Sequence, residues 1–390
     1  MEIQRNFYLN EFIDRMDNGL IKIITGMRRC GKSYLLDPIF KNYLIEKGVE
    51  ADHIIKLSLD ERANKKYLDP DELDNYIRSL VVDNKKYYLL LDEIQEVKEF
   101  ESVLIGFMHM SNVELYVTGS NSKFLSSDIV TEFRGRGDEI RVYPLSFDEF
   151  FSVYGESEEK ALNEYYTYGG LPLTLLAKTD NAKTNYLKMQ KENVYINDIV
   201  ERNNIQRIDI LDSLINMLAS SVGSLTNPQK IFDTFKSKGE KELSLNTINS
   251  YIADIEDSFI VNKSTRYDIK GKAYIETPKK YYFSDLGLRN ARINFRQFEQ
   301  THSMENIIYN ELRMRGYSVD IGVIPIAERD QEGNSSDSSD WLKICLYKYG
   351  ACPSIKSRMK QYLIFNCDYH SMKCRNKQSC QIPPTNSFPI

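Results

Sequence analysis

Short apolar runs alternate with segments of helical periodicity over roughly the first 145 residues. Five runs rich in aliphatic and β-branched residues predict strands, at residues 20–25, 53–59, 87–91, 113–117 and 139–142. After the first run, residues 33–48 place apolar side chains at the spacing of a helix. Strands that alternate with helices form parallel sheets. The pattern therefore predicts an α/β domain with a five-stranded parallel sheet over residues 1–150.

The periodicity is helical from residue 146 to about residue 204, with one interruption at Gly169–Pro172. Helices without intervening strands do not extend a parallel sheet, so this stretch lies outside the first domain. We expect residues 151–225 to form a helical connector or lid.

Residues 226–292 carry the pattern of a winged helix-turn-helix. Pro228 opens a short helix, and Ser244 caps a second one over residues 246–257. Two apolar and aromatic pieces then predict a two-stranded wing, at residues 259–261 and 280–283. The segment between them contains Lys270 and Lys272.

The pattern breaks near the end of the chain. One more amphipathic helix, residues 304–315, is expected to open a partial α/β domain at 293–333. Beyond Gly333 no period predicts a buried helix or strand, and no glutamate follows Glu332. We expect the tail, residues 334–390, to be disordered or the product of a frame-shifted or truncated reading of the last domain.

Five of the six cysteines lie in this tail, which raises zinc binding as an alternative. The spacing of a zinc site is approached by one group, Cys367, His370, Cys374 and Cys380. A second closely spaced pair upstream is missing from the sequence, so the frame-shift hypothesis explains the tail better.

Composition narrows the class of protein further. With 42% hydrophobic and 27% charged residues the chain is typical of a globular protein. It contains no apolar run of about 18 residues and no apolar segment near the N-terminus, so we expect a cytoplasmic protein that does not enter a membrane. The net charge of −5 gives no general attraction to nucleic acid.

A phosphate-binding loop follows the first predicted strand. Residues 26–33, GMRRCGKS, match the pattern G-x-x-x-x-G-K-[ST] at every fixed position. Lys32 would bind the β- and γ-phosphates, and the Ser33 hydroxyl would be a ligand of Mg²⁺. The residues expected to contact ATP are Gly26, Met27, Arg28, Arg29, Cys30, Gly31, Lys32, Ser33 and Tyr34. Arg28 and Arg29 could instead face a partner, and Cys30 is expected to be a small buried residue.

The third predicted strand ends in two acidic residues, Asp92 and Glu93. Asp92 would hold Mg²⁺, and Glu93 would act as the base that polarises an attacking water. The pair could also merely cap the next helix, but a phosphate-binding loop upstream favours the catalytic role. We therefore expect ATP hydrolysis rather than phosphoryl transfer, since no acceptor site of the kinase type is recognisable.

Two further groups are candidates for the same site. Ser120 and Asn121 follow the fourth predicted strand and could sense the γ-phosphate, although the same residues also suit an ordinary turn. Arg134 and Arg136 could supply an arginine finger to the same subunit or to a neighbouring one, which would require a homo-oligomer. Ion pairing within residues 134–139 is the alternative.

With these motifs placed, the chain resembles a prokaryotic family of AAA-type ATPases. Members join an archaeal-ATPase-like AAA domain to a winged helix and a restriction-endonuclease-like C-terminal domain. The resemblance covers roughly the first 330 residues and rests on segments that occur in serial order: 24–36, 87–95, 116–137, 143–151, 168–172 (YGGLP), 266–272, 281–290 (YYFSDLGLRN) and 304–319.

The resemblance implies ATP binding and hydrolysis by Lys32, Ser33, Asp92 and Glu93, with Mg²⁺ as cofactor. It also implies a nuclease-like domain that begins at Glu305, but the acidic strand pair that such a domain needs is not recognisable after Gly322, so we expect no nuclease activity.

The leading hypothesis is an ATPase that drives a conformational change in the winged helix. The alternative is a nucleotide-dependent DNA-binding switch with little turnover of ATP. Besides ATP, we expect the winged helix to bind a partner that is either nucleic acid or protein.

Overall fold

The computed structural model describes residues 3–119, 133, 135–190, 196–268, 273–296, 300–329 and 335–347. The fold described below belongs to one compact unit, Met1–Leu346. No helix in the described ranges is long and apolar enough to cross a membrane.

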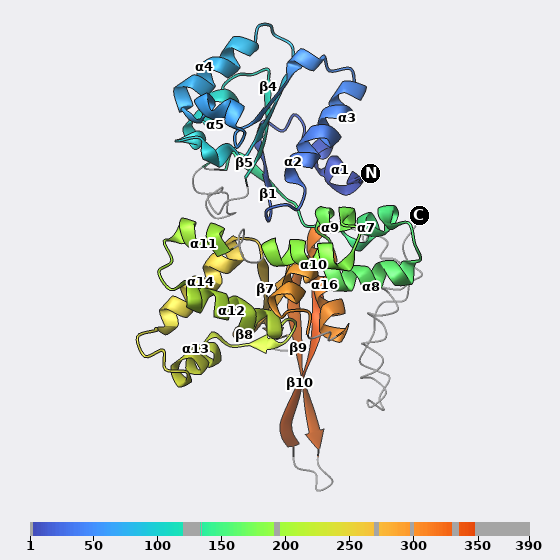
Figure 1. The fold of residues 1–390 in the computed structure, drawn as a ribbon, viewed down its shortest axis with the longest axis vertical. Coiled ribbons are helices and arrows are strands. Elements are labelled where there is room, and N and C mark those ends of the chain that lie inside the picture. Colours follow the sequence, from blue (N-terminus) through green and yellow to red (C-terminus); the bar gives the residue numbers. More distant parts are fainter. Residues whose placement is uncertain are drawn as a thin grey trace. The chain divides into compact units, whose positions relative to one another are not determined.

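The first sheet is built as the apolar runs predict. It contains β1 (Ile21–Thr25), β2 (Ile54–Ser58), β3 (Tyr87–Asp92), β4 (Val113–Thr118) and β5 (Gly137–Arg141). Their order is β2-β3-β4-β1-β5, and every pair is parallel (Figure 1). The predicted fold class, an α/β P-loop architecture with a five-stranded parallel sheet, is confirmed. The strand order places β1 between β4 and β5, so the loop after β1 begins at an interior strand of the sheet and not at an edge strand.

Helices cover both faces of this sheet, and every residue of β3 is therefore buried. Side chains of β3 alternate between two hydrophobic clusters: Tyr88 and Leu90 belong to one, and Leu89 and Leu91 to the other. The first cluster includes residues of α1 (Asn6–Asp14), η1 (Leu35–Phe40) and α3 (Lys41–Glu46). The short helix α2 (Lys32–Tyr34) lies between β1 and η1 in the chain. The second includes residues of η3 (Arg62–Leu68), α4 (Pro70–Leu80), η4 (Ile94–Glu96) and α5 (Phe100–Met108). A short turn, η2 (Ala51–His53), precedes β2.

The helix expected over residues 33–48 is interrupted. Asp37 has extended backbone angles, φ −143° and ψ 116°, between the helical segments on either side. Pro38 explains the break, because proline lacks a backbone N–H and disfavours a helical conformation at the residue before it. The prediction of one continuous helix was wrong at this point.

A helical region follows the first sheet. It consists of α7 (Phe147–Tyr154), α8 (Glu158–Tyr168), α9 (Pro172–Leu176), α10 (Asp180–Met189), α11 (Ile196–Asn203) and α12 (Ile208–Ser220). The interruption expected at residues 169–172 is the α8–α9 connection.

The remaining elements form a second sheet with helices. They are β6 (Leu225–Thr226), α13 (Pro228–Ser237), α14 (Leu245–Asp257), β7 (Val261–Asp268), β8 (Ala273–Phe283), α15 (Leu286–Arg292), α16 (Gln300–Met314), β9 (Ser318–Arg329) and β10 (Ser335–Tyr347). The sheet order is β10-β9-β7-β8-β6. Residues 335–347 thus form a strand beside β9. The expectation that no strand follows residue 333 was wrong for this stretch. A strand that pairs with a long neighbouring strand can form even when its own sequence does not alternate apolar and polar residues. The tail hypotheses on Cys367, His370, Cys374 and Cys380 lie outside the described residues.

The α8–α9 connection is locked against the start of α15. Asp285 is fully buried, and its carboxylate accepts hydrogen bonds from the backbone N–H of Gly170 (2.7 Å) and Leu288 (2.9 Å). Asn290 donates its side-chain amide to the carbonyl of Tyr166 at 2.8 Å. A side chain at Gly170 would lie 2.4 Å from the carbonyl oxygen of Leu145, so only glycine fits there. The segment that leads into α9 is therefore held from both sides.

The buried carboxyl of Asp285 predicts a pH-dependent stability. Burial raises its pKa to about 6, although backbone N–H groups partly offset this effect. The unfolded chain binds this proton only below about pH 4, so the group's contribution to the free energy of unfolding is complete below pH 4 and is lost as the pH rises through 6, by roughly 3 kcal/mol. In urea denaturation, the stability of wild type relative to Asp285→Asn should fall by that amount between pH 4 and pH 7. Asp233→Asn, which changes an exposed carboxyl on α13, is the control; a difference for Asp285→Asn that stays flat with pH would contradict the prediction.

Candidate nucleotide-binding site

The loop between β1 and α2 has the backbone geometry that a phosphate cradle needs. Gly26 has φ +137°, and a Cβ there would lie 2.2 Å from the carbonyl oxygen of Val142. Gly31 has φ +101° and precedes the first residue of α2. Both conformations favour glycine, so two fixed positions of the motif are explained by backbone sterics.

The side chain of Lys32 folds back over the phosphate-binding loop. The residue is only 4% exposed, and its ammonium group donates to the carbonyl oxygens of Gly26 (2.9 Å) and Met27 (3.1 Å). A cation held over the interior of a loop of backbone N–H groups is suited to bind the oxygens of a polyphosphate. The local fold thus brings charge and amide donors together within eight consecutive residues.

Ser33 and Asp92 meet although they are far apart in the chain. The Ser33 hydroxyl hydrogen-bonds to the Asp92 carboxylate, which also accepts a hydrogen bond from the hydroxyl of Thr118. Burial raises the pKa of Asp92, and the nearby carboxylates of Glu93 and Asp60 act in the same direction. A hydroxyl and a carboxylate oxygen side by side, with two more acids near, form the hard oxygen donor set that Mg²⁺ prefers. These residues therefore fit the magnesium site that the sequence predicts.

Glu93 stands at the carboxyl end of β3, beside Asp92. It adopts a left-handed conformation, φ 52°, and its backbone N–H donates to the hydroxyl of Thr118 at 3.0 Å. Its carboxylate accepts a hydrogen bond from the side-chain amide of Gln95, which is buried. This strained conformation turns the Glu93 side chain to the wall of the same cavity that the phosphate-binding loop lines.

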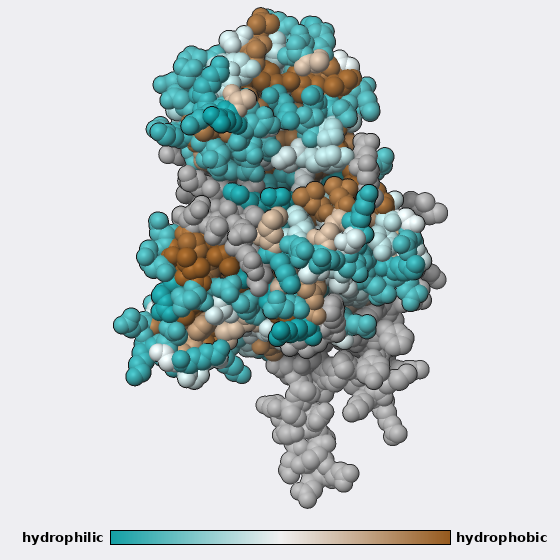
Figure 2. Space-filling model, in the orientation of Figure 1, coloured by the Kyte–Doolittle hydropathy of each residue, from teal (hydrophilic) through white to brown (hydrophobic). Residues whose placement is uncertain are grey.

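Part of the phosphate-binding loop and Glu93 line a cavity of about 520 Å³, a size that suits a nucleotide. Its polar wall consists of Arg5, Arg28, Arg29, Gly31, Lys32, Ser33, Tyr34, Asp60, Glu93 and Glu96. Its apolar wall consists of Ile3, Leu145, Pro172, Leu173 and Leu176. Leu173 and Leu176 are 40% and 57% exposed, and Figure 2 shows hydrophobic surface at the position of α9. The cavity thus offers polar groups that suit phosphates and apolar side chains that suit a flat apolar group.

Several of these residues were not found by sequence reasoning. Arg5, Asp60 and Glu96 belong to no recognisable motif. Pro172, Leu173 and Leu176 of the apolar wall come from α9, more than 130 residues beyond the phosphate-binding loop. The only local signal was the break in helical periodicity at residues 169–172, which marks the turn into α9.

The residues of the loop do not all face the cavity. Cys30 is fully buried with its sulfur 3.5 Å from the carbonyl oxygen of Val142, and Met27 is 1% exposed. Only the backbone of these two residues can contact a ligand. Arg28, Arg29 and Tyr34 line the cavity and stay candidates for nucleotide binding.

Of the two arginines expected as an arginine finger, the structure describes only Arg136. Ser120, Asn121 and Arg134 lie outside the described residues. Arg136 is exposed, and its carbonyl oxygen accepts a hydrogen bond from the N–H of Ile21, the first residue of β1. The phosphate-binding loop leaves from the other end of β1, about 16 Å away at ~3.3 Å per residue. Arg136 therefore does not suit its own chain's site, and its action on a neighbouring copy stays a prediction.

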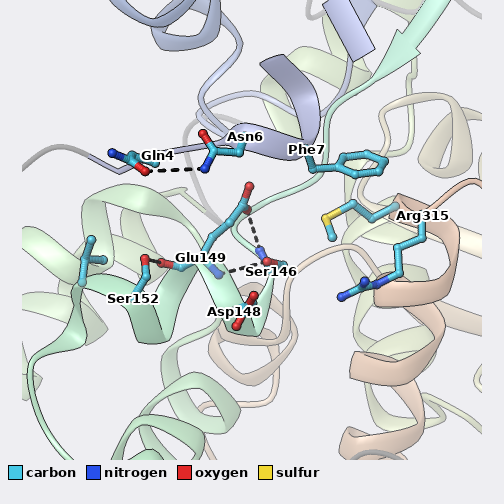
Figure 3. Close-up of a pocket in the computed structure, with 10 residues that line it drawn as sticks. Gln4, Asn6, Phe7, Ser146, Asp148, Glu149, Ser152 and Arg315 are labelled. Carbon is cyan, nitrogen blue, oxygen red and sulfur yellow. Dashed lines mark hydrogen bonds between the residues drawn. The ribbon is translucent and has the colours of Figure 1, made fainter. Parts of the chain in front are cut away.

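A second cavity of about 490 Å³ lies between the N-terminal segment, α7 and the end of α16. Figure 3 shows Gln4, Asn6 and Phe7 on one side, Glu149 and Ser152 of α7 below them, and Arg315 opposite. It contains none of the residues expected to bind nucleotide.

Comparison with known proteins gives two family matches. Residues 18–151 match the family described as AAA domain, and residues 159–299 match a domain of unknown function (DUF8612). Among solved structures, the ORC1 protein of Aeropyrum pernix in complex with DNA aligns with a TM-score of 0.30 and 12% identity, over 75% of this chain and 93% of that one. A DNA polymerase III gamma subunit-related protein of Thermotoga maritima aligns with a TM-score of 0.31 and 9% identity, over 64% and 97%.

Two relatives cover most of the chain. An uncharacterized protein of Methanocaldococcus jannaschii is 29% identical over 345 residues, 83% of this chain and 74% of its own length. An uncharacterized protein of Haemophilus influenzae is 34% identical over 348 residues, which cover 88% of this chain and 86% of that protein. The N-terminal part matches the AAA domain family and has a P-loop NTPase fold, and the chain belongs to the same family as the Haemophilus influenzae protein.

Proposed function

We propose that the chain binds ATP with Mg²⁺ in the cavity beside the phosphate-binding loop and hydrolyses it. The observation that carries the proposal is that Lys32, Ser33 and Glu93 line one cavity, with Asp92 hydrogen-bonded to Ser33 beside it. A lysine, a hydroxyl and two acids in this arrangement supply each group that hydrolysis of a nucleoside triphosphate needs from a protein.

Each residue has a distinct role in this proposal. Lys32 and the backbone N–H groups of the loop bind the β- and γ-phosphates. Ser33 and Asp92 would hold Mg²⁺, which neutralises charge on the phosphate oxygens when it is bound. Glu93 accepts the proton of the attacking water. The apolar wall of α9 and Leu145 is suited to pack against the base.

We further propose that residues 226–292 form a winged helix whose position responds to the nucleotide. Two consecutive helices, α13 and α14, followed by the antiparallel pair β7–β8, support this assignment. The domain boundaries 1–150, 151–225, 226–292 and 293–333 remain part of the same proposal.

A protein partner suits α14 better than DNA does. The helix contains no lysine or arginine and ends with Asp254, Glu256 and Asp257. A base-reading helix needs positive charge near the phosphates of DNA. The predicted contacts of Lys270 and Lys272 lie outside the described residues.

Nuclease activity is not part of the proposal. The carboxylate of Glu305, the residue at which the resemblance would start a nuclease site, accepts hydrogen bonds from Lys280 (2.7 Å) and Tyr282 (2.6 Å). Among the described residues, the one group of three or more acids, histidines or cysteines close enough to share a metal is Glu50, Asp52 and His53, in another part of the fold.

The magnesium role of Asp92 is testable by itself. We expect Asp92→Asn to lower ATP hydrolysis at least about 100-fold, because charge on the phosphates is no longer neutralised, and to shift the Mg²⁺ concentration for half-maximal rate upwards. The measurement is steady-state phosphate release over a Mg²⁺ titration. Asp71→Asn, an exposed acid in the first turn of α4, is the matched control. An unchanged Mg²⁺ dependence in Asp92→Asn would remove Asp92 from the site.

A further inference from the structure

A buried arginine links the phosphate-binding loop to the N-terminal segment. Arg5 is only 2% exposed, and its guanidinium donates to the carbonyl oxygens of Cys30 (2.8 Å), Tyr143 (2.8 Å) and Pro144 (3.4 Å). It also donates to both oxygens of the Glu149 carboxylate, each at 3.2 Å. The guanidinium therefore joins three segments that are far apart in the chain.

The carboxylate that pairs with Arg5 is itself fixed. Glu149 accepts a hydrogen bond from the backbone N–H of Ser146 at 3.0 Å, and the Ser146 hydroxyl accepts one from the N–H of Glu149 at 3.1 Å. This capping box starts α7, and Figure 3 shows Glu149 between Ser146 and the segment that carries Gln4 and Asn6. A buried charge is tolerated when it is paired and its hydrogen bonds are made. Arg5 is thus held by a rigid partner and can in turn hold the loop.

The contact with Cys30 has a geometric consequence. In a trans peptide, the carbonyl of one residue and the N–H of the next point in opposite directions. The carbonyl of Cys30 is turned toward Arg5, so the N–H of Gly31 points away from the guanidinium. Gly31 has φ +101°, and because glycine has no Cβ its φ is less restricted than that of other residues, so the orientation of this peptide depends on the groups that contact it.

We propose that Arg5 is a positioning residue for phosphate binding. It fixes the Cys30–Gly31 peptide in the orientation that offers the N–H of Gly31 to the phosphates of a nucleoside di- or triphosphate. The inference rests on the proposed function, since it takes the cavity to be a nucleotide site. A hydrogen bond to a charged phosphate that is made in the ground state and in the transition state alike changes affinity and not the chemical step.

The sequence allows a direct observation of this peptide. Cys30–Gly31 is the only cysteine–glycine pair in the chain. Labelling cysteine carbonyls with ¹³C and glycine amides with ¹⁵N therefore leaves a single amide signal, that of Gly31, in a carbonyl-filtered NMR spectrum. We expect this signal to move when ADP and Mg²⁺ are added to the wild-type chain.

In Arg5→Gln we expect the Gly31 signal to start at a different position and to respond little to ADP. Affinity for ATP and ADP should fall roughly tenfold or more, as for loss of a hydrogen bond to a charged group, with kcat within about threefold of wild type. Glu149→Gln, which keeps Arg5 but removes the charge that holds it, should give a smaller change of the same kind. Arg15→Gln is the matched control, because Arg15 also pairs with two carboxylates, Glu11 and Asp138, but contacts no residue of the loop.

The outcomes separate the two proposals. If wild type binds ADP and the Gly31 signal of Arg5→Gln responds to ADP as in wild type, Arg5 does not position the peptide and the inference fails alone. If wild type neither binds ADP nor shows a shift, the proposed function fails and the inference with it. Should Arg5→Gln not fold, Arg5→Lys replaces it: one ammonium cannot reach all the oxygens of the guanidinium, so the same altered Gly31 response is expected, and a normal response would overturn the inference.

Discussion

We expect Lys32→Ala to lose ATP binding and Glu93→Gln to retain it while turnover stops. The ammonium of Lys32 lies over the interior of the phosphate-binding loop and donates to two carbonyl oxygens of the loop. Lys32→Ala therefore removes the positive charge that is held there. Affinity for ATP should fall at least about tenfold, the loss expected for a charge-assisted contact. The measurement is equilibrium binding of a fluorescent ATP analogue.

Glu93→Gln keeps the shape of the side chain and removes the base. Loss of a general base typically lowers the rate by about 10² to 10⁴, and we expect kcat in this range with ATP affinity near that of wild type. Lys47→Ala and Glu46→Gln, both exposed at the end of α3, are the matched controls. Turnover by Glu93→Gln at the wild-type rate would assign the base to another residue. A wild type that binds ATP without turnover would favour the switch hypothesis.

The largest effect on stability is expected from Gly287→Ala. Gly287 lies in α15, and a Cβ there would be 2.1 Å from the carbonyl oxygen of Tyr168 and 2.5 Å from its carbonyl carbon. A backbone group cannot move aside as a side chain can. Overpacking of this kind costs roughly 3 kcal/mol or more, and we expect the free energy of unfolding in urea to fall by that amount.

A second helical glycine supplies the control. Gly106 lies in α5, where a Cβ would meet no atom closer than 3.7 Å, the side-chain nitrogen of Arg78. Gly106→Ala should therefore raise the free energy of unfolding by about 0.5–1 kcal/mol through the helix preference of alanine. Equal stabilities for the two variants would mean that α8 and α15 do not pack as described.

The same substitution connects stability to the nucleotide site. Tyr168 is followed by Gly169, Gly170 and Leu171, and the next residue, Pro172, lines the cavity. A displaced Tyr168 carbonyl would shift the turn into α9 and with it the apolar wall. We therefore expect ATP affinity to fall together with stability in Gly287→Ala and to be unchanged in Gly106→Ala.

The polar half of the candidate site could be predicted because its residues are local. Gly26–Ser33 and Asp92–Glu93 are short runs that each follow an apolar strand. In a parallel sheet the carboxyl ends of strands share one edge, so the strand pattern places Ser33 and Asp92 at the same edge; their contact depends in addition on the order of the strands. The same rule would have excluded Arg136 from its own chain's site, since it precedes a strand and so lies at the opposite edge.

The sequence by itself determined the parallel sheet, the phosphate-binding loop and the acidic pair, because hydrophobic period and consecutive motif residues specify them. Tertiary structure alone decided the rest of the site. Arg5 meets Cys30 and Glu149, and Asp285 meets Gly170, across separations of 25 to 144 residues. The residues next to Arg5 or Asp285 in the sequence do not indicate which groups each will contact. A buried charge is stabilised by backbone carbonyl or N–H groups that surround it. Every residue has such backbone groups, so the sequence does not show which of them will surround the charge once the chain has folded.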